Sequence, residues 1–131
     1  MTTKVESGPD TAPVEAYVAA VVAQDRDAVA AVFSDAVEMR AVVPRGFREA
    51  DGPDAAAELI CGWFADAELT VLIREVEPIA DRVRLRYRFR ALEDGRTSVV
   101  EQHGFADVAD GRIVKLQLMC SGFRPLDASP V

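Results

Sequence analysis

Apolar residues recur at helical spacing in three segments of this chain and at strand spacing in several others. Pro13 suits the first turn of one helix, and Asp25 or Asp27 can cap a short second helix that ends near Phe33. A third helix is expected from Pro53. The apolar face of this third helix comprises Ala56, Leu59, Ile60, Trp63 and Phe64.

Alternation of apolar and polar residues predicts the strands. It is clearest at 82–92, where every second residue from 82 to 90 is an arginine and the residues between them are apolar or aromatic. The Asp-Gly pairs at 94–95 and 110–111 predict hairpin turns. Residues 44–53 are expected to form a loop. The remaining strands are expected at 37–43, 69–77, 97–108 and 113–121.

Helices grouped early and hairpins grouped late predict an α+β fold, with a sheet of four or five mostly antiparallel strands covered on one face by the helices. The polar segment 1–12 is expected to be a flexible N-terminal tail. The folded domain is expected over 13–123, and residues 124–131 are expected to be a C-terminal tail.

The composition and charge of the chain limit the kinds of partner that are expected. The chain has 131 residues, of which 50% are hydrophobic, and this suits one folded domain. A net charge of −7 argues against nucleic acid or an anionic membrane as a partner. No metal-ligand cluster or phosphate-binding loop is recognisable, so no metal or cofactor is expected. No signal peptide or apolar run of about 18 residues is present, so a soluble, cytoplasmic protein is expected.

The order of elements resembles the nuclear-transport-factor-2-like superfamily. AYVAAVVAQDRDAVAAVFSDAVEMRA resembles the opening of SnoaL-like proteins and ketosteroid isomerases, and DGRIVKLQL resembles their last hairpin. The resemblance covers residues 13–122. It implies a cone-shaped curved sheet wrapped around the N-terminal helices and enclosing an apolar pocket. Members of this superfamily include isomerases, cyclases, dehydratases, epoxide hydrolases and plain binding modules, and the fold alone does not decide among them.

Two residues are catalytic candidates by this resemblance. Tyr17 matches a tyrosine that donates a hydrogen bond to the substrate oxygen in the isomerases, although it can equally be a core aromatic. His103 is the only histidine. Counting back from DGRIV and Phe105 places it where the isomerases carry a buried acid, and there it could donate, accept or transfer a proton. The alternative is a histidine held by Glu101 or by backbone.

The general base of the isomerases has no counterpart here. Met39 and Ala41 occupy the positions that match its aspartate, while alternation places Glu38 and Arg40 on the opposite face. The Asp-Arg-Asp set of epoxide hydrolases is not recognisable, and a dehydratase-like site would need two histidines. An apolar wall is nevertheless expected to bind a hydrophobic small molecule. Its candidate residues are Phe33, Met39, Leu59, Trp63, Phe64, Leu116, Leu118 and Cys120.

The arginine row at 82–90 is expected to lie on the outer face of the sheet, paired with Glu75, Glu77 and Glu101 or with Asp66 and Glu68. Proteins of this resemblance often dimerise through that face, so a homodimer is expected. The leading hypothesis is therefore an isomerase, cyclase or dehydratase of secondary metabolism in which Tyr17 and His103 polarise or protonate a substrate oxygen. The alternative is a non-catalytic binding or protein-interaction module of the same fold.

Overall fold

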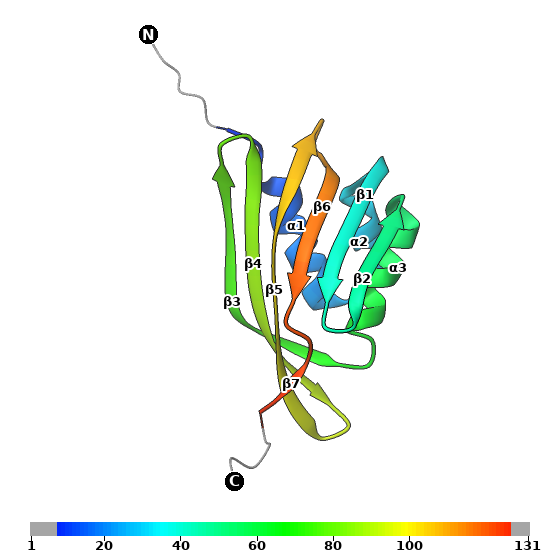
Figure 1. The fold of residues 1–131 in the computed structure, drawn as a ribbon, viewed down its shortest axis with the longest axis vertical. Coiled ribbons are helices and arrows are strands. Elements are labelled where there is room, and N and C mark those ends of the chain that lie inside the picture. The colour runs from blue at the N-terminus through cyan, green and yellow to red at the C-terminus, as the bar shows by residue number, and fades with distance from the viewer. Residues whose placement is uncertain (1–7, 127–131) are drawn as a thin grey trace.

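One curved, unclosed sheet carries three helices on a single face (Figure 1). The computed structural model describes residues 8–126. The helices are α1 (Ala12–Ala23), α2 (Arg26–Ala31) and α3 (Pro53–Trp63). The strands are β1 (Phe33–Val43), β2 (Gly46–Asp51), β3 (Glu68–Ile79), β4 (Arg82–Glu93), β5 (Arg96–Ala109), β6 (Arg112–Cys120) and β7 (Arg124–Pro125).

The sheet has the order β2-β1-β6-β5-β4-β3, and β7 pairs with β5 beyond the end of β6. Only the β1–β6 pair is parallel, and the other neighbours are antiparallel. The α+β class and the mostly antiparallel curved sheet predicted from the sequence are therefore confirmed. No helix within residues 8–126 has the length and apolar character needed to span a membrane.

Local signals in the sequence account for the helix ends and the hairpins. The side chain of Asp25 caps α2 by accepting a hydrogen bond from the Ala28 amide at 3.1 Å. Pro53 occupies the first turn of α3, as predicted. Asp94 and Asp110 each adopt a positive φ of 54°, followed by a glycine that also has a positive φ, which is the backbone that tight hairpins require.

Three boundaries differ from the predictions. Residues 46–51, expected to be part of a loop, form β2, which pairs with β1 along its whole length. Only Ala50 of this edge strand is buried, so alternation gave no signal for it. β1 begins at Phe33 rather than at 37. Arg124 and Pro125, expected to start a tail, form β7, whereas the rest of both expected tails lies largely outside the described residues.

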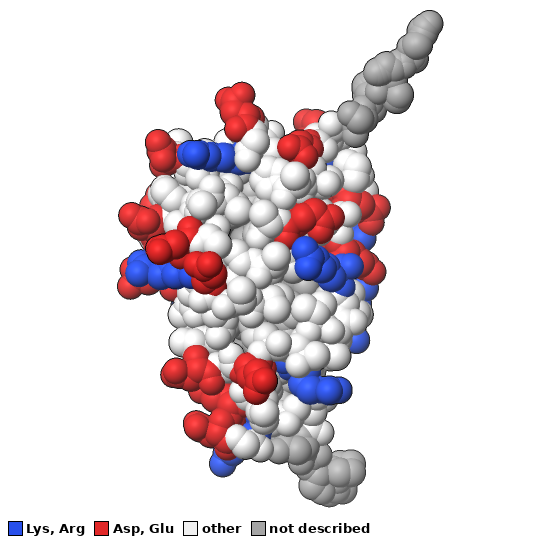
Figure 2. Space-filling view, turned by 180° about the vertical axis from the view of Figure 1, so that it is seen from behind, with Lys and Arg blue, Asp and Glu red and all other residues white. Residues whose placement is uncertain are grey.

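The core lies between the helices and the inner face of the sheet. In β4, the alternate residues Val83, Leu85, Tyr87 and Phe89 are fully buried, as the alternation predicted. The opposite side of the helices faces solvent, and acidic side chains outnumber basic ones on that face (Figure 2). This distribution agrees with the net charge of the chain.

Candidate functional site

A chain of three buried polar side chains crosses the core. The hydroxyl oxygens of Tyr17 on α1 and Tyr87 on β4 lie 2.9 Å apart. The Tyr87 hydroxyl donates to the Oε1 atom of Gln102 on β5. Because a tyrosine hydroxyl carries one proton, Tyr17 is the donor in its contact with Tyr87. All three residues are fully buried.

The Gln102 amide lies at the end of this polar chain and has an unpaired hydrogen-bond donor. Its Nε2 atom is buried and has no hydrogen-bond partner within the described part of the chain. Leaving a buried donor unpaired costs about 1–3 kcal/mol, so such groups call for an explanation. A donor aimed at a ligand oxygen is one such explanation.

Burial fixes the protonation state of the two tyrosines. It is the largest influence on the Tyr17 hydroxyl and raises its pKa well above the ordinary value, although the hydrogen bond with Tyr87 partly offsets this. Burial also raises the pKa of Tyr87, and the neighbouring Tyr17 adds to the effect. Both hydroxyls are therefore neutral hydrogen-bond donors rather than proton acceptors.

Gln102 lies in a row of neighbours across the sheet. Tyr87 is its register partner on β4, and Cys120 is its register partner on β6. Such partners lie about 4.5–5.5 Å apart between Cα atoms and project their side chains to the same face. The half-buried Cys120 thus connects the buried amide to the end of β6.

A hollow of about 420 Å³ opens at that end of the sheet, and we call it the mouth hollow. Its lining comprises residues 43–45 of the β1–β2 connection, Arg48, Trp63, Cys120 and residues 122–124. Aromatic rings link it to the core. The Phe123 ring lies 5.9 Å from that of Phe64, which lies 5.7 Å from Phe89, and Phe89 stacks on Tyr87 at 4.9 Å. A row of packed aromatic rings therefore connects the mouth hollow to the polar chain.

Gly122 shapes the rim of the mouth hollow. Its φ is +77°, a region that side chains rarely adopt. A Cβ atom at this position would also lie 2.6 Å from Cγ of Pro44, so the β1–β2 connection packs directly against the segment that leads to β7. Glycine is required here on both grounds.

The expectation that His103 faces the interior is wrong. Its side chain is 55% exposed on the outer face and contacts the Glu101 carboxylate, so the structure does not bring it together with Tyr17. The residue that faces inward is its neighbour Gln102. The count back from DGRIV and Phe105 failed because Phe105 shares a strand face with His103 and is itself exposed, whereas Val100, Gln102 and Ala106 are buried. Alternation along β5 therefore places Gln102 on the inner face and His103 on the outer one.

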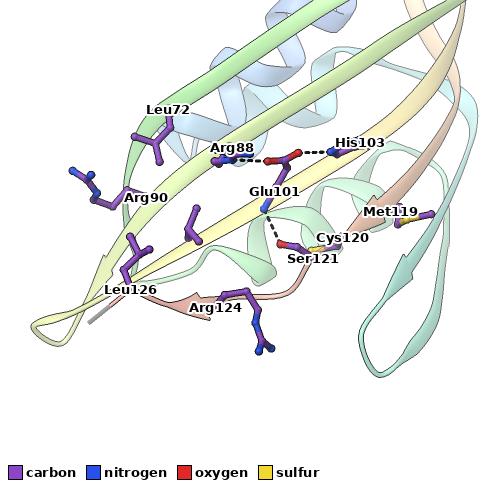
Figure 3. Close-up of a pocket in the computed structure, with 11 residues that line it drawn as sticks. Leu72, Arg88, Arg90, Glu101, His103, Met119, Cys120, Ser121, Arg124 and Leu126 are labelled. Atoms are coloured by element: carbon purple, nitrogen blue, oxygen red, sulfur yellow. Dashed lines mark hydrogen bonds and ion pairs between the residues drawn. The ribbon is translucent and has the colours of Figure 1, made fainter. Parts of the chain in front are cut away.

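His103 instead lines a second hollow of about 620 Å³ on the outer face, the outer hollow (Figure 3). There Arg88 and His103 both point toward the Glu101 carboxylate, which Arg86 also contacts at 2.8 Å. Burial would raise the pKa of Glu101, but the hydrogen bonds from Arg86, Arg88 and His103 together lower it to about 2. This cluster is an ion-paired network that satisfies its own charges.

The predicted wall residues divide into two groups. Trp63 and Cys120 line the mouth hollow. The others pack in or against the core: Phe33, Met39, Phe64, Leu116 and Leu118 are buried, and Leu59 is partly buried. Met39 and Ala41 do face the interior, while Glu38 is exposed, so the position of the isomerase base is occupied by apolar side chains.

Sequence reasoning missed Gln102, Tyr87 and the arginines of the mouth hollow. Tyr87 was visible in the alternation of β4, and the even-numbered alternation Val100, Gln102 and Ala106 would have indicated Gln102. Nothing local marks the arginines, because they meet only in the folded chain. Within the described residues, no group of three or more histidine, cysteine or carboxylate side chains is placed to hold a metal ion.

Comparison with known proteins identifies a matching family and solved structures of similar fold. The family profile described as the SnoaL-like domain matches residues 14–116. No curated protein sequence matches the chain.

Three solved structures illustrate the likeness of fold. A provisionally named polyketide cyclase from Xanthomonas campestris pv. campestris is 22% identical over 83% of this chain and 87% of its own, with a TM-score of 0.68. An LEH-like epoxide hydrolase from M. tuberculosis is 22% identical over 85% of this chain and 81% of its own, with a TM-score of 0.67. A protein of ketosteroid-isomerase-like fold from Catenulispora acidiphila, in complex with trimethylamine, is 16% identical over 87% of both chains, with a TM-score of 0.70.

Proposed function

The chain belongs to the SnoaL-like domain family, and from this premise we propose that it binds an apolar small molecule whose oxygen atom accepts a hydrogen bond from Gln102. The ligand enters through the mouth hollow and displaces the side chains between that hollow and the amide. The observation that carries the proposal is the unpaired, buried Nε2 atom of Gln102 at the end of the tyrosine chain.

The chemistry of this proposal is polarisation of an oxygen. The Nε2 donor approaches a carbonyl or hydroxyl oxygen, while Tyr87 holds the other end of the amide in place. A preorganised donor in a site of low polarity stabilises negative charge that develops on such an oxygen. Tyr17 supports the arrangement through Tyr87, and His103 has no part because it lies on the outer face.

The proposed reaction class, where the protein is catalytic, is that of an isomerase, cyclase or dehydratase acting on a ring compound. Polarising a carbonyl acidifies the neighbouring C–H bond and makes the carbonyl carbon more electrophilic, which serves any of these reactions. The names of the neighbours, which include a polyketide cyclase and an epoxide hydrolase, support enzymes as relatives. The apolar Met39 and Ala41 at the place of the isomerase base favour the alternative, a binding module without turnover.

A pair of matched ligands tests the oxygen contact. Tetralone and tetralin share a fused ring skeleton, and only tetralone has a carbonyl. We expect the protein to bind tetralone more tightly by about fivefold to tenfold, which corresponds to one net hydrogen bond. The Gln102→Leu variant should lose this preference while keeping its affinity for tetralin.

The control for this test is Gln117→Leu, the same substitution on the outer face, where Gln117 accepts a hydrogen bond from Arg82 at 2.7 Å. This control should keep the preference for tetralone. Equal affinity of the unmodified protein for both compounds, or a preference that survives in Gln102→Leu, would overturn the proposal.

We also propose that a second copy of the chain covers the outer face. Phe47, Val42 and Met119 are register partners across β2, β1 and β6, and each is at least 50% exposed. Four of the five arginines at 82–90 on β4 are paired with carboxylates of the same chain, as in the contacts of Arg84 and Arg86 with Glu75. A partner could therefore pack on most of this face without burying unpaired charge.

A further inference from the structure

We propose that the mouth hollow selects ligands that carry an anionic group, so that the ligand of this protein is an apolar ring compound bearing a carboxylate or phosphate. This inference rests on the proposed function, because it assumes that ligands enter through the mouth hollow. It adds a substrate class that the apolar core does not specify.

The charge of the mouth hollow carries the inference. Arg45, Arg48 and Arg124 belong to its lining, which contains no aspartate or glutamate. None of the three forms an ion pair with any residue of the described range 8–126. Three guanidinium groups without an ion-pair partner among residues 8–126 therefore lie at one opening of a chain whose net charge is −7.

Several arginines on the outer face of the sheet are instead paired with carboxylates. On the outer face, Arg82 contacts Asp107, Arg84 contacts Glu75 and Arg88 contacts Glu101. Those arginines have partners within the chain, and the outer hollow that Arg88 lines also contains Glu101. Among the described residues, the lining of the mouth hollow contains three arginines and no carboxylate, so an anion from outside would pair with them.

The remaining lining defines the body of the ligand. Trp63 and Phe123 offer aromatic faces, and the volume of about 420 Å³ suits a molecule of one to three rings. Arg45 and Arg48 come from the β1–β2 hairpin and Arg124 from β7, so guanidinium groups approach from two separate segments. The planar guanidinium group matches the geometry of carboxylate and phosphate oxygens.

The arginines of the mouth hollow and the Gln102 amide together define an orientation for the ligand. The arginines are exposed at the rim, whereas Gln102 lies in the core beside Cys120, which also lines the mouth hollow. The anionic group would therefore remain at the rim while a second oxygen at the far end of the ring system reaches the Gln102 amide. A ring acid with a distal carbonyl has this shape.

Trp63 gives a direct readout, because it is the only tryptophan of the chain and lies in the mouth hollow. The probes are tetralone, a tetralone ring carboxylate and naphthyl phosphate, titrated against tryptophan fluorescence at low salt. We expect the carboxylate or the phosphate to bind at least tenfold more tightly than neutral tetralone. The Arg45→Gln/Arg48→Gln variant should lose about fivefold to tenfold in affinity for the anions and leave tetralone unaffected. Comparison of the two anions identifies the preferred group.

The control is Arg112→Gln, which removes the same charge at the opposite end of β6, about 25 Å from Cys120 along the strand. It should leave all affinities unchanged. Equal binding of neutral and anionic probes, or equal losses in the control and the mouth variant, would overturn the inference and leave the proposed function standing. Failure of tetralone to bind better than tetralin would overturn the proposed function instead.

Discussion

The hydroxyl oxygen of Tyr17 lies 2.9 Å from that of Tyr87, and this contact joins the first helix to the centre of the sheet. Through Tyr87 it continues to Gln102, whose Nε2 atom has no partner in the described part of the chain. The core therefore presents a hydrogen-bond donor where an entirely apolar core would present none. The arrangement favours recognition of an oxygen atom over abstraction of a proton.

Removal of the Tyr17 hydroxyl should weaken the fold modestly. Tyr17→Phe deletes one buried hydrogen bond but keeps the ring contacts with Phe33 and Tyr87, so we expect a loss of about 1 kcal/mol in the free energy of unfolding. Urea denaturation measures it. Gln102→Leu should cost at least as much, since it removes the unpaired Nε2 donor but leaves the buried Tyr87 hydroxyl without its acceptor. A smaller loss in Gln102→Leu than in Tyr17→Phe would contradict this account.

The two tyrosines should resist ionisation in the folded protein. Burial raises the pKa of both above the ordinary value, and the chain contains no other tyrosine, so tyrosinate absorbance reports on this pair alone. Above about pH 10 the unfolded chain loses these protons while the folded chain keeps them, so stability falls as pH rises. We expect tyrosinate absorbance to appear together with loss of the folded circular dichroism signal. Earlier ionisation in the folded state would show that the hydroxyls are accessible to water.

The Glu101 carboxylate should contribute to stability above about pH 4.5, its ordinary pKa. Its folded-state pKa is lowered to about 2, so the contribution is present above the unfolded pKa and is lost as pH falls toward 2. Glu101→Gln should lower the free energy of unfolding at pH 7 by about 1–2 kcal/mol and should flatten its decline in this window. Denaturation at several pH values measures this effect, with Glu93→Gln, on an exposed hairpin position, as the control. Identical pH profiles for the two variants would refute it.

A side chain at Gly122 should destabilise the rim of the mouth hollow. Gly122→Ala combines a φ of +77° with a Cβ position 2.6 Å from Cγ of Pro44, and we expect a loss of about 2 kcal/mol. Gly95→Ala is the matched control, because Gly95 has a φ of +75° and no atom within 4 Å of its added Cβ. The difference between the two melting curves isolates the contact with Pro44. Equal losses in the two variants would mean that Pro44 moves away from the added Cβ atom without a measurable loss of stability.

The outer face should determine the oligomeric state. Met119→Asp or Val42→Asp places a charge in the exposed apolar row and should shift sedimentation from dimer to monomer. Ala19→Asp, at an exposed position of α1 on the other side of the molecule, serves as the control and should leave the dimer intact. A monomer for the unmodified protein at micromolar concentration would end the dimer proposal.

The sequence by itself determined the fold class and the main elements, though not β2 and β7. Alternation placed β4 and its buried face because local spacing alone decides which side chains share a side of a strand. The Asp-Gly pairs determined both hairpins, since few residues other than glycine adopt the required backbone. The resemblance to SnoaL-like proteins, carried by the opening helices and the last hairpin, agrees with the family match.

Only the tertiary structure decided which residues make the site. Gln102 rather than His103 faces the core because Gln102 shares with Val100 and Ala106 the side of β5 that the helices cover, and a single strand does not show which of its sides is covered. Likewise Arg45, Arg48 and Arg124 come together only when β7 pairs with β5 and Gly122 packs on Pro44. Local periodicity fixes the face of a residue within its own strand, whereas contacts between distant segments fix what that face meets.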